Sequence, residues 1–105
     1  MDGRTSVRYL QDYIRQKDHH PERLTVYFLK LAEEVGELSR AMQEGRTAAD
    51  AGEIKGTIDE ELWDVMYYTL ALANLYGVDM ERAIAAKEAL NQRRYPAAVA
   101  FEADR

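Results

Sequence analysis

Residues 57–76 read TIDEELWDVMYYTLALANLY, and this stretch decides the fold. It opens with a capping box, in which the Thr57 hydroxyl and the Glu60 carboxylate each accept a hydrogen bond from a free backbone N–H at the start of a helix. Apolar side chains then recur every three or four residues, which is the period of an α-helix. We therefore predict a helix over residues 57–76 whose inward face carries Ile58, Leu62, Val65, Met66, Thr69, Leu72, Ala73 and Tyr76.

Three further helices are predicted from the same kinds of signal. Apolar spacing indicates a short helix over residues 6–18. A second helix begins near Pro21, runs to about residue 44 and stops at Gly45. A last helix covers residues 79–95, with an aspartate at its start and a proline after its end. The inward face of the second helix is expected to carry Leu24, Phe28, Leu31, Val35, Leu38 and Met42.

These elements predict an all-α fold with a four-helix bundle-like protomer. Residues 46–56 contain glycine and aspartate without apolar periodicity, so we expect a loop there. No run of alternating Val, Ile or Thr lies between turn residues, so no strand is predicted. The chain of 105 residues allows one domain, 1–105, with a core over about residues 6–95 and a C-terminal tail over residues 96–105.

Composition excludes several classes of function. The net charge of −5 disfavours general nucleic-acid binding, because a phosphate backbone would be repelled. No apolar run is long enough for a transmembrane helix, so no membrane partner is expected. The chain has no cysteine, which excludes disulfides and thiolate metal sites and favours a reducing, cytoplasmic location.

Charge is unevenly distributed along the chain. Residues 33–64 contain ten acidic and three basic side chains, whereas residues 82–95 contain four basic and one acidic. An acidic middle followed by a basic end suits a metal ion and an anion that bind side by side.

Two pairs of carboxylates lie on the flanks of the predicted inward faces. With about 100° of rotation per residue, Glu34 and Glu37 follow one flank of the second helix. Glu61 and Asp64 follow the corresponding flank of the third, with Tyr68 between them. If the two helices pack antiparallel, the pairs face each other, and four converging carboxylates need a cation to offset their repulsion. Oxygen ligands suit Mg²⁺ or Mn²⁺, so this is a candidate metal site.

A solvated acidic face is the alternative, because most glutamates on helix surfaces only contact water. Two features favour the metal site: each pair begins at the margin of an apolar face, and the pattern occurs on both helices. Gly36 lies between the two acids of the second helix, at a cost of about 1 kcal/mol relative to alanine. It indicates either close helix packing or room for a ligand or a neighbouring backbone.

These motifs resemble a known family. The run LAEEVGEL at residues 31–38, followed by ELWDV at residues 61–65, resembles the EExxE…ExxD signature of the MazG-like, all-α nucleoside triphosphate pyrophosphohydrolases. The run KEALNQRRYP at residues 87–96 resembles the K-x₃-N element of that family, especially in its dCTP pyrophosphatase branch. The resemblance covers residues 24–96. It implies hydrolysis of a (deoxy)nucleoside triphosphate to the monophosphate and pyrophosphate, which would clear non-standard or excess nucleotides.

The resemblance also implies roles for individual residues. It assigns the Mg²⁺ to Glu34, Glu37, Glu61 and Asp64, and gives Glu33 an assisting role with the metal or the attacking water. These five acids form the expected catalytic set. The triphosphate would be held by Lys87 and Asn91, with Tyr68 near the sugar or phosphate. Of the two following arginines one is expected to reach phosphate, taken here as Arg94, and the other to stay solvated at the helix C-terminus, where a cation is favoured.

Two other functions stay open. Phosphoribosyl-ATP pyrophosphohydrolase shares the fold and the acidic pairs but usually has a histidine soon after the second acidic motif, and none follows Asp64. A non-enzymatic helical interaction module would leave the acids on the surface. Trp63 is a candidate to stack on the nucleobase, to pack on a partner subunit or to pack on the first helix. His19 and His20 are expected in a surface turn.

The third helix also predicts self-association. It carries Tyr67, Leu70 and Leu75 outside its inward face. A helix that is apolar over most of its circumference is usually buried on more than one side. We therefore expect a homodimer or a dimer of dimers with the second and third helices in the interface, as the resemblance also implies.

Overall fold

The computed structural model describes residues 1–103, and these residues contain helices and no strand. This confirms the predicted all-α class. In chain order the elements are α1 (Val7–Lys17), the 3₁₀ turn η1 (Pro21–Arg23), α2 (Leu24–Glu44), α3 (Ala48–Ala51), α4 (Ile58–Leu75) and α5 (Met80–Arg94). None of them combines the length and apolarity needed to cross a bilayer. Asp104 and Arg105, the end of the predicted tail, lie outside the described residues.

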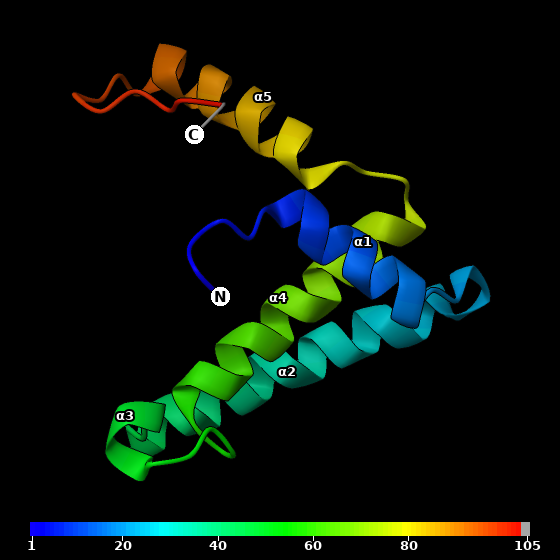
Figure 1. The fold of residues 1–105 in the computed structure, drawn as a ribbon, viewed down its shortest axis with the longest axis vertical. Helices are drawn as coiled ribbons and strands as arrows, with labels where there is room; N and C mark the ends of the chain where they lie inside the picture. Colours follow the sequence, from blue (N-terminus) through cyan, green and yellow to red (C-terminus); the bar gives the residue numbers. More distant parts are fainter. Residues whose placement is uncertain (104–105) are drawn as a thin grey trace.

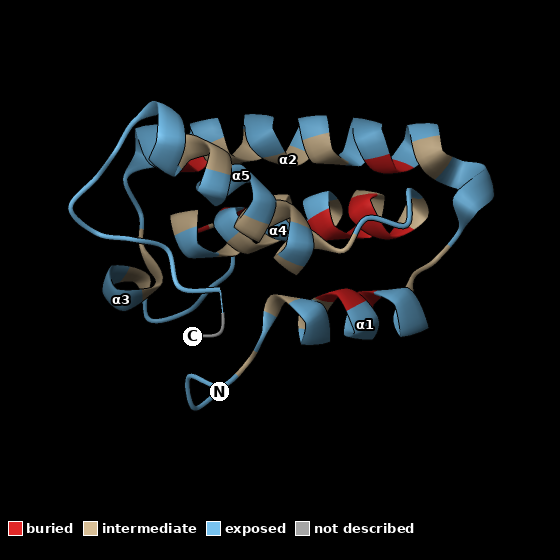
Figure 2. Ribbon diagram, turned by 90° about the horizontal axis from the view of Figure 1, so that it is seen from above, coloured by how far each residue is buried: buried red, intermediate tan, exposed pale blue. Residues whose placement is uncertain are grey.

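The two long helices α2 and α4 form the frame of the molecule. They run antiparallel and side by side, and α5 projects away from them (Figure 1). Viewed from above, α4 lies between α2 on one side and α1 on the other (Figure 2). This middle position explains why α4 also carries apolar residues outside its predicted inward face, since α1 covers that side of the helix.

The start of α4 is capped much as its sequence predicts. The Thr57 hydroxyl accepts a hydrogen bond from the Glu60 backbone N–H at 3.3 Å. The Glu60 carboxylate accepts from the N–H of Gly56 at 2.9 Å, one residue earlier than an ordinary capping box requires. The expected loop before it contains the short helix α3, whose first N–H, on Ala48, is bound by the Asp59 carboxylate at 2.6 Å.

The predicted inward face of α2 is wrong in direction. The residues of α2 that are least exposed are Tyr27 and Ala41, with Leu31, Glu34 and Leu38 between them. The face through these residues is rotated about the axis of α2 by about 60° from the predicted inward face. The physical reason is that polar partners draw this side inward, because Tyr27 donates a hydrogen bond to Asp18 and Glu34 meets the carboxylates of α4.

Several predicted core residues are therefore exposed in the single chain. They comprise half of the face expected on α2 and half of that expected on α4: Phe28, Val35, Met42, Leu62, Met66, Thr69 and Tyr76. By contrast, Leu70 belongs to the buried cluster around Ile14 of α1, and Tyr67 and Leu75 pack against this cluster. These three residues are covered within one chain and need no second subunit.

A buried polar network fixes the start of α5 to α1. The Gln11 side chain donates to Asn74 Oδ1 at 3.1 Å and to the Val78 carbonyl at 2.9 Å, and its Oε1 accepts from the Met80 N–H at 2.9 Å. Arg8 adds an ion pair with Asp79 at 3.1 Å. Because each buried polar group of this network has a partner, the turn between α4 and α5 holds a defined direction.

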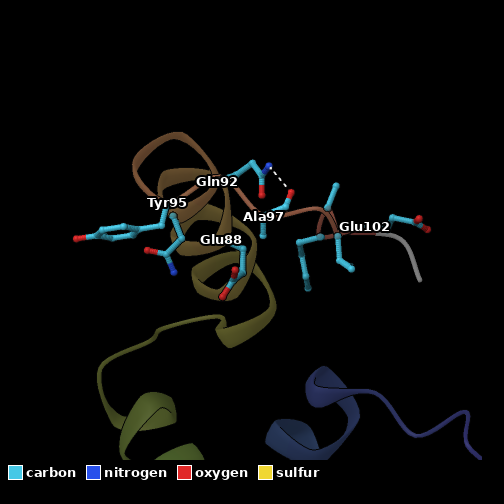
Figure 3. Close-up of a pocket in the computed structure, with 9 residues that line it drawn as sticks. Glu88, Gln92, Tyr95, Ala97 and Glu102 are labelled. Carbon is cyan, nitrogen blue, oxygen red and sulfur yellow. Dashed lines mark hydrogen bonds between the residues drawn. The ribbon is translucent and has the colours of Figure 1, made fainter.

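Beyond that anchor α5 is free of the bundle. The helix contains no buried residue, and its substantial contacts within the described chain are with α1. The C-terminal tail folds back beside it, where Gln92 donates to the Ala97 carbonyl at 3.3 Å. Figure 3 shows Glu88 and Gln92 beside this tail segment, around a cavity of about 460 Å³.

Candidate metal centre

Three carboxylates from the two long helices converge at the α2–α4 seam. Glu34 comes from the middle of α2, and Glu61 and Asp64 come from the first two turns of α4. One oxygen of each lies within 4.8 Å of the others. The convergence follows from the antiparallel packing, which sets the middle of one helix against the start of the other. Three of the four metal ligands implied by the motif are thus brought together.

The neighbouring acids of α4 are occupied elsewhere. Asp59 binds the first N–H of α3, and Glu60 binds the N–H of Gly56. Glu61 is left to point into the seam, where it is only 6 % exposed. Within residues 1–103, its Oε2 is buried and has no hydrogen-bond partner. A buried carboxylate oxygen without a partner is costly, and a bound cation would satisfy it.

The electrostatics of the cluster favour a bound cation. Burial, a hydrogen bond with Glu61 and the negative charge of Asp64 raise the pKa of Glu34 to about 7. Burial and the charge of Glu60 also raise the pKa of Asp64. Without a metal, a proton on Glu34 relieves the repulsion, because its O–H can donate to a neighbouring carboxylate. Hard oxygen ligands in this number suit Mg²⁺, so the residues present fit such an ion.

Glu37 and Glu33 lie outside this cluster. Glu37 forms an ion pair with Arg40, which also pairs with Glu44 at 3.2 Å. Glu33 is exposed and pairs with Lys30 at 3.6 Å. The implied role of Glu37 as a ligand stays a prediction, and it requires the carboxylate to exchange Arg40 for the metal. Beside Gly36 the space is open, because an added Cβ would meet no atom within 4 Å.

Tyr68 lies next to the cluster, one turn beyond Asp64. Burial raises the pKa of its hydroxyl, and the charges of Lys30, Asp18, Glu34 and Asp64 all act on it. Tyr68 therefore lies beside the acidic cluster, and its expected place near the sugar or phosphate stays a prediction.

The phosphate-binding residues predicted on α5 are not brought to the cluster within one chain. Lys87 and Arg94 are exposed and take part in no ion pair within residues 1–103. Asn91 lines the cavity beside the C-terminal tail. The acidic cluster lies on α2 and α4, and α5 contacts chiefly α1. The acidic and basic parts of the expected site are consequently separated in a single copy of the chain.

Trp63 faces the first helix, one of the three neighbours that the sequence allowed, across a cavity. Its ring meets Tyr67 edge to face at 6.0 Å. It lines a cavity of about 660 Å³ with Tyr9, Leu10 and Tyr13 of α1 and with the N-terminal segment. The expected surface turn at the histidines is confirmed for His20, which is exposed, whereas His19 is half-buried.

Sequence reasoning missed a second polar group close to the metal cluster. Asp18 accepts hydrogen bonds from the hydroxyls of Tyr27 at 2.6 Å and Tyr67 at 2.8 Å. Burial alone would raise the pKa of Asp18, but these two hydroxyls, with His20 and Lys17 nearby, hold it below its usual value. An aspartate in a helix-breaking turn carries no signal that two tyrosines from other helices will reach it.

Comparisons with known proteins agree with this architecture. Residues 22–99 match the MazG nucleotide pyrophosphohydrolase domain. The chain is 37% identical over 93 residues to dCTP pyrophosphatase 1 from Homo sapiens, covering 83% of this chain and 52% of that protein. It is 37% identical over 84 residues to dCTP pyrophosphatase 1 from Rattus norvegicus, covering 74% of this chain and 47% of the relative. The chain thus spans about half the length of these curated relatives.

Solved structures extend the similarity to the whole fold. A crystal structure of iMazG from Vibrio DAT 722 has 43% sequence identity and a TM-score of 0.78, and the match covers 89% of this chain and 100% of that one. A second crystal structure of iMazG from the same source has 44% identity and a TM-score of 0.76, covering 84% and 99%. At 43–44% identity, these proteins are similar to this chain in sequence as well as in fold.

The raised pKa of Glu34 predicts how the metal-free protein responds to pH. Between about pH 4.5 and 7 the folded chain holds a proton on Glu34 that the unfolded chain has lost, so stability falls as pH rises through this window. Glu34→Gln has no such proton to lose. In EDTA it should exceed the parent in free energy of unfolding by on the order of 1–3 kcal/mol at pH 8 and lose this gain near pH 4.5. Urea unfolding at both pH values measures this.

Glu53→Gln is a suitable control, because Glu53 is exposed in the loop before α4. It should keep the pH response of the parent. Equal stability of Glu34→Gln and the parent at pH 8 would show that Glu34 carries no excess repulsion.

The orphaned oxygen of Glu61 predicts the effect of metal on stability. Without Mg²⁺, Glu61→Gln should fold as well as the parent or slightly better, because one charge leaves the cluster. Parent protein should gain about 2.7 kcal/mol at an Mg²⁺ concentration a hundredfold above its Kd, and Glu61→Gln should lose most of that gain. Melting curves at zero and millimolar Mg²⁺ measure this, with Glu53→Gln again as control. An equal Mg²⁺ effect on parent and Glu61→Gln would remove Glu61 from the ligands.

Proposed function

Because this chain belongs to the MazG nucleotide pyrophosphohydrolase family, we propose that it hydrolyses a nucleoside triphosphate to the monophosphate and pyrophosphate. The observation that carries the proposal is the cluster of Glu34, Glu61 and Asp64, with its raised pKa values and its partnerless buried oxygen. Nucleotides of the cytoplasmic pool are the proposed substrates, and removal of non-standard or excess nucleotides is the proposed role. Similarity to dCTP pyrophosphatase makes dCTP the first nucleotide to test.

Mg²⁺ is the proposed cofactor, held by Glu34, Glu61 and Asp64. When bound, it would supply positive charge against the phosphate oxygens and lower the pKa of a coordinated water. Glu34 would bind it as a carboxylate, because the cation would offset the repulsion that otherwise keeps a proton on this side chain. Glu37 would join the set only if its ion pair with Arg40 were broken. Glu33, the exposed neighbour of Glu34, is the proposed acceptor of the proton from the attacking water.

We propose that a second copy of the chain completes the site. Lys87, Asn91 and Arg94 lie on a helix that its own bundle leaves uncovered, away from the acids that would need them. An apolar surface on α2 and α4 is also uncovered, which is unusual for a monomer. This surface, called here the exposed apolar face, is formed by Phe28, Val35, Met42, Leu62, Met66 and Tyr76. A homodimer or a dimer of dimers that buries the exposed apolar face would bring the basic helix α5 of a partner toward each acidic cluster.

One panel of substrates tests the activity. Nucleoside triphosphates, with dCTP among them, and phosphoribosyl-ATP are incubated with Mg²⁺, and pyrophosphate and single phosphate are measured separately. Pyrophosphate from a nucleoside triphosphate supports the proposal. Turnover of phosphoribosyl-ATP alone would instead identify the related enzyme of histidine synthesis. No release from any substrate would favour a non-enzymatic interaction module.

Substitutions of the proposed phosphate-binding residues on α5 should lower activity to different degrees. Lys87→Ala should lower kcat/KM by about tenfold or more, because a charge-assisted contact to phosphate is lost. Asn91→Ala should lose less, corresponding to about 0.5–1.5 kcal/mol for a neutral hydrogen bond. Both variants should keep the Mg²⁺-dependent rise in melting temperature. Arg82→Ala, on the exposed side of the same helix, is the control. Unchanged kinetics in Lys87→Ala would remove this residue from the site.

Assembly and its role in catalysis can be measured together. Light scattering at micromolar concentration should give at least the mass of a dimer. If the acidic cluster and Lys87 act from different chains, a mixture of Glu61→Gln and Lys87→Ala should recover up to roughly a quarter of parental activity, because half of the dimers are mixed and each has one intact site. A monomeric mass contradicts the assembly, and a dimeric mixture without recovery contradicts the shared site.

A further inference from the structure

A small cavity lined by charged and tyrosine side chains lies beside the acidic cluster, between α2 and α4. It has a volume of about 90 Å³. Its walls come from the turn before η1, from η1 itself, from α2 and from α4: Asp18, Arg23, Val26, Tyr27, Lys30 and Tyr68. A cavity of this size is far below the 300–1,000 Å³ usual for whole ligands. It suits a single small group of a larger substrate and not a nucleobase.

The cavity lies one helical turn away from the acidic cluster, between the same two helices. Lys30 lies four residues before Glu34 on α2, and Tyr68 lies four residues after Asp64 on α4. Because the helices are antiparallel, both side chains are displaced by about 6 Å in the same direction along the α2–α4 interface. The charges of Lys30, Glu34 and Asp64 all act on the Tyr68 hydroxyl. The metal cluster and the cavity are therefore consecutive layers of one groove.

The charge of the walls favours an anion. Asp18 is the acid in the wall, and its two oxygens are already occupied by the hydroxyls of Tyr27 and Tyr67. Arg23 takes part in no ion pair within residues 1–103. Lys30 pairs only loosely with Glu33 at 3.6 Å, with both side chains about half exposed. The side chains of Arg23 and Lys30 and the Tyr68 hydroxyl can thus contact a phosphate group without breaking a buried contact.

We propose that Lys30, together with Arg23 and the Tyr68 hydroxyl, binds phosphate groups of the substrate that extend from the metal toward the start of α2. This inference rests on the proposed pyrophosphohydrolase function and specifies one part of it. Lys30 supplies a cation from the same chain as the acids, independently of the basic helix α5. The bound anion would then lie between the metal ion at one end and two cationic side chains at the other, which matches the alternating charge of a metal–polyphosphate complex.

Inorganic tripolyphosphate is a suitable probe, because it has neither base nor sugar. With Mg²⁺ present, calorimetry should give binding to the parent and about tenfold weaker binding to Lys30→Met, which keeps the helix propensity and the length of the side chain. Lys30→Arg should stay within about threefold of the parent, because the positive charge is kept. Lys55→Met is the matched control, because Lys55 also lies near the acidic residues, at 3.9 Å from Glu60, but is 86% exposed and outside the cavity.

The outcomes separate this inference from the proposed function. Parental binding in Lys30→Met, or equal losses in Lys30→Met and Lys55→Met, would overturn the role of Lys30. A parent that hydrolyses nucleotides but does not bind tripolyphosphate would assign the cavity to another part of the substrate and also overturn it. A parent that releases no pyrophosphate from any nucleotide would instead overturn the proposed function. Because Lys30 is exposed, its substitution should leave the melting temperature of the metal-free protein unchanged.

Discussion

Repulsion between three carboxylates inside a helix seam is the constraint on which the rest of this molecule depends. Glu34, Glu61 and Asp64 are held together by the same packing of α2 on α4 that forms the body of the chain. The fold cannot relax this repulsion by moving one helix without uncovering its own core. It has to be offset by something bound, either a proton or a cation. Stability and metal affinity are therefore two aspects of one electrostatic balance.

The middle position of α4 links this balance to the rest of the structure. One side of the helix carries the acids toward α2, and another contributes Leu70 and Ala71 to the cluster around Ile14 of α1. Its C-terminal end contributes Asn74 to the network that directs α5. A single helix thus carries two of the three clustered carboxylates, completes the core and sets the direction of the proposed phosphate-binding helix. This arrangement explains why residues 57–76 carry so much of the information about the fold.

The helices and the convergence of Glu34 with Glu61 and Asp64 could be predicted from the sequence, because both depend on local periodicity and on one antiparallel contact. The direction of the inward face of α2 could not. Phe28 and Val35 are as apolar as core residues, and a helical projection cannot distinguish a face buried within the chain from one left exposed. Tyr27 faces inward because its hydroxyl donates a hydrogen bond to Asp18, a residue that lies outside the helix. The position of Lys87 relative to the acids could not be predicted either, since it depends on the direction of the turn after α4.

The weak attachment of α5 has a consequence for how the protein can change over time. Apart from its anchored start, the helix buries no side chain, so most substitutions along it leave the stability of a single chain nearly unchanged. The acidic cluster has no such freedom, because each of its members also lies in the packed seam. Substitutions on α5 can accordingly change the proposed phosphate-binding side chains without loss of folding, whereas a substitution in the acidic cluster also alters the packing of α2 on α4.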